Sequence, residues 1–301
     1  MRKDLLPSAG IALGASMWGL FWIPVRGIET AGVESFWAGP VVFAAGGVLF
    51  LPVLILRIRT LIAGWRAFLL PGLLSGLAFS LYTASLLITE LVRAMLLFYI
   101  SPLWSILLGV FILNEKLTLN RMLAVLLSLG GLYVMLMVEG GFPIPRNAGD
   151  WLALASGICW SVASVRLFQG GVEQLLEKVT TFIFCAFVTS LMLVYWQQGG
   201  FDGMPGLATL QAGWYWIAII AVAMMPICYL TIWPATVLSP ARVGMLLMME
   251  VLVGVISAAI LTDEPFGTRE LSGTILVISA ALVEVARQQK QTGSDKVAES
   301  Q

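Results

Sequence analysis

Apolar runs of about 20 residues dominate this chain, and each is long enough to cross the hydrocarbon core of a bilayer as a helix. The runs follow one another with short connections between them. They lie near residues 8–27, 34–57, 66–88, 92–113, 118–138, 149–168, 179–198, 212–233, 240–262 and 269–287. The sequence therefore predicts an all-α integral membrane protein with ten transmembrane helices.

The composition supports a membrane protein and argues against several other classes. Of the 301 residues, 59% are hydrophobic and only 11% are charged, whereas soluble domains carry about 25% charged residues. Seventeen basic and 17 acidic residues cancel, so no nucleic acid is expected as a partner. Histidine is absent and the three cysteines lack metal-ligand spacing, so neither a cofactor nor a metal site is expected.

The distribution of basic residues predicts the orientation. If the N-terminus is cytoplasmic, thirteen basic residues fall on the inner side and only four, Arg26, Arg93, Arg146 and Arg269, on the outer side. Cytoplasmic loops of membrane proteins retain Lys and Arg. We therefore expect both termini to be cytoplasmic, with a disordered polar tail at 288–301.

The chain also carries signs of an internal duplication. The segments "FILNEKLT" (111–118) and "AILTDEPFG" (259–267) each end an apolar run with an acidic block, and Glu115 and Glu264 lie 149 residues apart. Further pairs have the same offset or one of 142, namely Trp65 with Trp214, Arg93 with Arg242, and Trp18 with Trp160.

Such a duplication places five helices in each half. Because five is odd, the second half must enter the membrane from the opposite side, and inverted repeats of this kind belong mainly to transporters. We expect a first repeat over 1–138, a connector over 139–150, an inverted second repeat over 151–287 and the tail over 288–301.

Two segments resemble a known family. They are "SPLWSILLGVFILNEKLT" (101–118) and "EVLVGVISAAILTDEPFG" (250–267), which look like the segment of EamA-type exporters, in the drug/metabolite transporter superfamily, that runs from a proline to a glutamate. Pro102 and Glu115 fit this pattern, and Glu264 fits it too, but Val251 stands where the second proline is often found. The Trp-rich first helix is most similar to bacterial exporters of aromatic amino acids, which implies the inner membrane.

Aromatic and hydroxyl side chains near the middle of the spans are candidates for substrate contact. Trp18 and Trp22 lie four residues apart, as do Trp160 and Ser164, so each pair shares a helix face. Buried tyrosines combine an apolar ring with a hydroxyl that needs a partner. The expected substrate-binding residues are Trp18, Trp22, Tyr82, Thr83, Tyr99, Ser101, Trp160, Ser164 and Tyr229. The alternative is packing and hydrogen bonding between helices.

Prolines, glycines and tryptophans elsewhere have structural interpretations. Pro24, Pro102 and Pro226 are candidate hinges, since proline bends membrane helices. The pairs Gly10 and Gly14, and Gly72 and Gly76, predict close helix contacts. Tryptophans near span ends belong to the interfacial belt, and these are Trp37, Trp65, Trp151, Trp196, Trp214 and Trp216.

Glu250 is the clearest acidic residue inside an apolar run. A carboxylate at that depth needs a cavity, a partner or a proton. Two roles remain open: a hydrogen bond to a neighbouring helix, which we favour, and a proton carried during transport.

The sequence contains no GxxxxGK[ST] motif for ATP and no HExxH or comparable catalytic motif. We therefore expect a secondary transporter rather than an enzyme, exporting small molecules by alternating access through a central cavity, with aromatic amino acids favoured. Export of drugs or cationic metabolites on the same fold is the alternative, and an intramembrane enzyme is a more distant one. The expected partners are the small-molecule substrate and the lipid bilayer. The sequence leaves the oligomeric state open, and a monomer is compatible with it.

Overall fold

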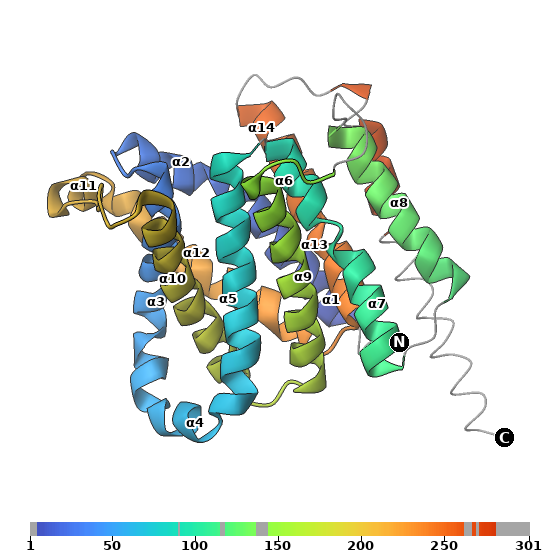
Figure 1. The fold of residues 1–301 in the computed structure, drawn as a ribbon, viewed down its shortest axis with the longest axis horizontal. Coiled ribbons are helices and arrows are strands. Elements are labelled where there is room, and N and C mark those ends of the chain that lie inside the picture. Colours follow the sequence, from blue (N-terminus) through green and yellow to red (C-terminus); the bar gives the residue numbers. More distant parts are fainter. Residues whose placement is uncertain are drawn as a thin grey trace.

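The computed structural model describes residues 5–89, 91–114, 118–136, 144–261, 267–268 and 271–280. Every regular element in these ranges is a helix (Figure 1). The helices are α1 (Leu5–Leu20), α2 (Trp22–Thr30), α3 (Ser35–Leu56), α4 (Ile58–Ala63), α5 (Trp65–Ile88), α6 (Leu91–Phe98), α7 (Ser101–Leu113), α8 (Leu119–Leu136), α9 (Ala148–Gln169), α10 (Leu175–Gln198), α11 (Leu207–Ala212), α12 (Trp214–Ala235), α13 (Pro240–Leu247) and α14 (Met249–Leu261).

Eight helical segments in the described ranges are long and apolar enough to cross a membrane. They are Leu5–Thr30, Ser35–Leu56, Trp65–Ile88, Arg93–Leu113, Ala148–Gln169, Leu175–Gln198, Trp214–Ala235 and Pro240–Leu261. Two shorter apolar helices, Met122–Val134 and Leu271–Ala280, lie inside the fifth and tenth predicted spans. The all-helical membrane fold is confirmed, whereas the count of ten spans is not.

Several predictions fall outside the described residues. Glu115 and Glu264, which marked the duplication, lie there, as does the tail 288–301. The connector 139–150 is described only from residue 144 onward.

Three of the predicted spans are broken helices. A break at Phe21 separates α1 from α2, and a second at residues 99–100 separates α6 from α7. Pro24 and Pro102 follow these breaks, and proline removes the hydrogen bond to the carbonyl four residues earlier. The third break, at Met248 between α13 and α14, has no proline near it.

Some helix boundaries coincide when the chain is shifted by 149 residues. Shifted by 149 residues, α4 falls on 207–212 and α6 falls on 240–247, which are the bounds of α11 and α13. The same shift brings the first residue of α5 onto the first residue of α12. Gly64 and Gly213 precede these two helices with similar φ angles of −98° and −95°.

Two contacts of α3 place the matching helices α4 and α11. Near the start of α3, the Trp37 indole donates a 2.9 Å hydrogen bond to the carbonyl of Asp202, shortly before α11. Just beyond the other end of α3, Arg57 forms a 3.0 Å salt bridge with Glu177 and leads into α4. Because α3 has 22 residues, about 33 Å of helix, α4 and its counterpart α11 lie at opposite ends of the bundle (Figure 1).

The contacts between helices also occur in matching pairs, in which each helix is replaced by the one at the corresponding position of the other half of the sequence. Helix α5 packs against α9, and correspondingly α12 packs against α1. Likewise α5 packs against α10 as α12 packs against α3, and α7 packs against α9 as α14 packs against α1. Such paired contacts are what an inverted repeat requires.

Glycines bring the central helices close together, as the sequence predicts. A Cβ added at Gly76 of α5 would lie 2.5 Å from the backbone nitrogen of Ala186 of α10. One added at Gly14 of α1 would lie 2.9 Å from Cβ of Leu230 of α12. Both positions therefore exclude larger side chains.

Candidate functional site

The candidate site lies where the broken span formed by α6 and α7 meets the broken span formed by α13 and α14. The first-half break at Tyr99 and the second-half break at Met248 are equivalent under the 149-residue shift. Helices α7 and α13 pack against each other, with Gly244 against Pro102, where an added Cβ would lie 3.1 Å from Cγ of the proline ring. Pro102 stands in the first turn of α7, where its missing N–H costs least.

A hydrogen bond joins the two breaks. The Tyr99 hydroxyl donates to Oε2 of Glu250 over 2.8 Å and lies 3.4 Å from the carbonyl oxygen of Leu247, the last residue of α13. Tyr99 is fully buried, whereas Glu250 is half-buried. One side chain of the first half therefore binds both the carboxylate and a free carbonyl at the break of the second half.

Aromatic rings form a continuous cluster around this contact. Phe79 of α5 is the centre of one part, with ring centroids 5.0 Å from Trp18, 5.5 Å from Trp160 and 5.3 Å from Phe182. Tyr82, one turn further along α5, stacks on Phe98 at 4.5 Å.

Phe98 in turn contacts Tyr99 edge to face at 4.9 Å. The cluster thus takes rings from α1, α5, α6, α9 and α10 and ends at the Glu250 carboxylate.

Two buried polar atoms of this cluster lack a hydrogen-bond partner in the part of the chain that the structure describes. They are the hydroxyl oxygen of Tyr82 and the indole nitrogen Nε1 of Trp160. More than nine in ten buried polar groups in proteins are hydrogen-bonded, to protein or to water. Both groups can donate a hydrogen bond to a further polar group between the helices.

Trp18 and Trp22 already have protein partners. The Trp18 indole donates to Oγ1 of Thr231 over 3.0 Å, and the Trp22 indole donates to Oγ of Ser257 over 3.0 Å. The break at Phe21 puts these tryptophans on separate helices, α1 and α2, so Trp18 faces α12 and Trp22 faces α14.

Three of the predicted hydroxyl residues have structural contacts. Thr83 donates to the carbonyl of Phe79 over 2.9 Å, and Ser164 donates to the carbonyl of Trp160 over 2.9 Å. The backbone carbonyl of Ser101, fully buried in the structure, accepts a 2.9 Å hydrogen bond from Ser161. The Thr83 and Ser164 bonds lie within their own helices, and only the Ser161–Ser101 bond joins two helices.

Tyr229 lies apart from the cluster. Its side chain is 40% exposed and stacks on Trp233 with ring centroids 6.1 Å apart. Of the candidate hinges, Pro24 and Pro102 follow helix breaks, whereas Pro226 lies inside the continuous helix α12.

The sequence interpretation missed the phenylalanines of the cluster, because it considered only tryptophan, tyrosine and hydroxyl side chains as candidates. It also assigned Trp37 to the interfacial belt, but this side chain is only 4% exposed and bonds to the loop before α11. Four of the predicted belt residues are more than half exposed, namely Trp65, Trp151, Trp196 and Trp214.

A buried ion pair ties α6 to the start of α9. Arg93 donates to Oδ2 of Asp150 over 2.5 Å, and Thr89 donates to Oδ1 over 2.6 Å. The Asn147 side chain caps α9 by accepting from the Asp150 amide over 2.8 Å. This cluster joins the two halves near the connector and has a structural role.

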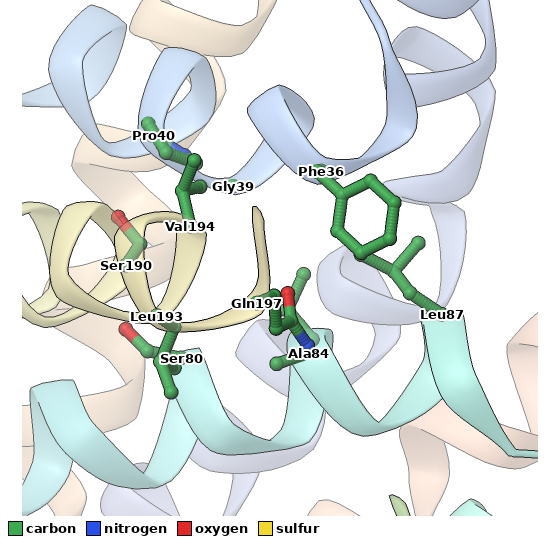
Figure 2. Close-up of a pocket in the computed structure, with 11 residues that line it drawn as sticks. Phe36, Gly39, Pro40, Ser80, Ala84, Leu87, Ser190, Leu193, Val194 and Gln197 are labelled. Carbon is green, nitrogen blue, oxygen red and sulfur yellow. The ribbon is translucent and has the colours of Figure 1, made fainter. Parts of the chain in front are cut away.

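Two of the cavities outside the aromatic cluster border α3. One, of about 750 Å³, lies between α3, α10, α11 and α12 and is lined mostly by apolar side chains such as Trp37, Phe187 and Trp214. The other holds only about 20 Å³ between α3, α5 and α10, with Gln197, Ala84 and Ser80 among its walls (Figure 2). That volume suits one water molecule, which would satisfy the buried Nε2 of Gln197.

Comparisons with known proteins agree with this architecture. The model of the EamA-like transporter family matches residues 7–137. No curated protein matches the sequence. One solved crystal structure of a protein has a TM-score of 0.70 and 17% identity, over 93% of this chain and 98% of that one. At this identity the likeness shows the fold alone.

The family match does not distinguish exporters of aromatic amino acids from other members. It covers nearly all of four of the eight long apolar helical segments. Residues 7–137 of this multi-pass membrane protein are similar to the EamA-like transporter family.

Proposed function

We propose that this protein is a secondary transporter that exports small metabolites carrying an aromatic ring and an ammonium group, with aromatic amino acids as the first candidates. The observation that carries the proposal is the Tyr99–Glu250 hydrogen bond between the two halves, beside an aromatic cluster with two unpartnered buried donors.

Each part of such a substrate has a matching group. The rings of Phe79, Tyr82 and Trp160 offer apolar and edge-to-face contacts to a flat side chain. The half-buried Glu250 carboxylate suits an ammonium group, since charge-assisted hydrogen bonds are about twice as strong as neutral ones. The Tyr82 hydroxyl and the Trp160 indole N–H can donate to a substrate carboxylate.

Alternating access is the proposed mechanism. Inverted halves related by the 149-residue shift can exchange conformations, so that one side closes as the other opens. The breaks at Tyr99 and Met248 interrupt two packed spans, and in this mechanism the spans bend there. In this mechanism the hydrogen bond between Tyr99 and Glu250 changes between the inward-open and the outward-open conformation.

A second candidate is export of cationic drugs or cationic metabolites. This candidate is favoured by the negative charge of Glu250 beside the aromatic cluster. Among the described residues, no basic side chain forms a salt bridge with Glu250. A zwitterion brings a carboxylate that must be held by neutral donors, whereas a cation does not.

Proteoliposomes holding the purified full-length chain separate the candidates. Counterflow of labelled Phe, Tyr and Trp, compared with cationic dyes, is measured at equal pH and across a proton gradient. Saturable amino-acid flux that unlabelled Trp inhibits supports the first candidate. Dye flux without amino-acid flux supports the second, and chemically altered substrate would contradict transport altogether.

A further inference from the structure

A polar cavity of about 420 Å³ lies at the end of the bundle where α4 lies, away from the aromatic cluster. Its walls come from the start of α5, the end of α9 and the turn that leads into α10. The lining residues are Arg66, Ala67, Phe68, Leu70, Pro71, Arg166, Gln169, Gly170, Glu173, Gln174 and Lys178. The cavity therefore joins one helix of the first half to two helices of the second.

The cavity has a net positive lining. Arg66, Arg166 and Lys178 face one carboxylate, Glu173. Lys178 is buried, and its Nζ donates to the carbonyls of Gly170 and Gly171 at the end of α9. These two hydrogen bonds fix the ammonium group of Lys178 beside the cavity.

The two arginines remain available to a ligand. Both are exposed, and neither forms a salt bridge in the part of the chain that the structure describes. Arg166 donates only to the neutral side chain of Gln169, over 3.2 Å. The acid nearest in sequence to Lys178, Glu177, is already paired with Arg57.

The surroundings match the membrane surface. Trp65 is 53% exposed, and the Arg66 guanidinium lies 5.4 Å from its ring centroid. Tryptophan and arginine in this arrangement are typical of the headgroup region. One turn further along α5, the side chains of Leu69, Leu70 and Leu73 are exposed. The basic cavity thus opens beside an apolar helix face.

We propose that this cavity binds the phosphate group of an anionic phospholipid, whose acyl chains lie along the leucines of α5. Arginine presents paired N–H donors that match phosphate oxygens, and Arg66 and Arg166 supply two such groups. Basic pockets between membrane helices on the cytoplasmic side are suited to anionic headgroups, and the charge distribution predicts this end to be cytoplasmic. The lipid would bridge the two halves of the bundle.

The test measures lipid retention by the purified full-length chain. Native mass spectrometry compares phosphatidylglycerol with phosphatidylcholine of the same acyl chains. We expect the wild type to prefer phosphatidylglycerol. Arg66→Gln and Arg166→Gln should each lower this preference about fivefold, and the double variant about twenty-five-fold.

Arg59→Gln is the matched control, because Arg59 is exposed on the adjacent helix α4 and does not line the cavity. It should retain the wild-type preference. An equal loss in this control, or equal retention of the two lipids by the wild type, would overturn the proposal. If a glutamine variant does not elute as folded protein, the lysine variants at the same positions replace it, with a smaller loss expected.

A further arm separates the two sources of phosphate. Inorganic phosphate and the water-soluble headgroup glycerophosphoglycerol are added as competitors. The lipid proposal predicts that neither displaces phosphatidylglycerol at millimolar concentration, because neither gains the contact with the leucines. Displacement by inorganic phosphate would overturn the lipid and identify a site for soluble phosphate.

Discussion

Tyr99→Phe isolates the hydrogen bond between the two halves. The substitution removes one oxygen atom and keeps the ring that contacts Phe98 at 4.9 Å. It deletes the 2.8 Å bond to Glu250 and the longer contact with the Leu247 carbonyl. The carboxylate then has no hydrogen-bond partner from the opposite half within the described residues.

The size of the effect follows from the type of bond. A hydrogen bond to a charged group contributes about 1.5–3 kcal/mol, and every 1.4 kcal/mol is tenfold in an equilibrium constant. If Tyr99 holds the Glu250 carboxylate where a substrate ammonium binds, substrate affinity should fall by about tenfold to a hundredfold.

The assay is equilibrium binding of labelled Trp to the purified protein, followed by counterflow in proteoliposomes. Tyr229→Phe is the matched control, because Tyr229 loses the same atom on the exposed side of α12. Binding by Tyr229→Phe should stay within about twofold of wild type, which is below the effect of any charge-assisted bond.

Equal affinities in the wild type and Tyr99→Phe would refute this reasoning, because the bond would then not position Glu250 for a ligand. An equal loss in Tyr229→Phe would refute it as well, since the effect would not depend on the contact between the breaks.

Four further outcomes are expected. Trp160→Ala should lower counterflow at equal expression far more than Trp214→Ala, because Trp160 is fully buried in the cluster and Trp214 is 67% exposed; equal losses would contradict the site. Glu250→Gln can still accept from Tyr99, so it should fold and equilibrate substrate, with weaker binding and an altered pH dependence of flux; a folded variant without any exchange at equal pH would argue for obligatory proton coupling. Arg93→Gln leaves its buried carboxylate partner uncompensated and should destabilise the fold by about 3–5 kcal/mol, measured as denaturant unfolding against Arg26→Gln on the exposed side of α2. Gly76→Leu should prevent α5 from packing against α10 and abolish folded protein on size exclusion, whereas Gly130→Leu, with nothing within 4 Å of an added Cβ, should not.

Much of the fold could be predicted because its signals are local. A run of about 20 apolar residues must cross the bilayer as a helix, whatever its neighbours are. The offset of 149 residues was visible in single landmarks such as Trp65 and Trp214, and it recurs in the bounds of α4 and α11. Glycine spacing likewise predicted close packing at Gly14 and Gly76.

The site was only partly predictable. The sequence proposed Tyr82, Tyr99 and Trp160 by depth alone, and the structure places these three side chains in one buried core. Depth could not separate them from Tyr229, which points outward, because the rotation of a uniformly apolar helix leaves no periodic signal. Phe79 was missed for the same reason, although it contacts more of the cluster's rings than any candidate did.

The amino-acid sequence by itself determined the all-helical membrane class of this protein, since length and hydropathy act along the chain. Only the tertiary structure decided that Glu250 bonds to Tyr99, 151 residues away, and that α13 ends at Leu247 without a proline. Those outcomes depend on which helices become neighbours. A carboxylate or a carbonyl freed within the bundle is stabilised only by a donor that packing brings to it.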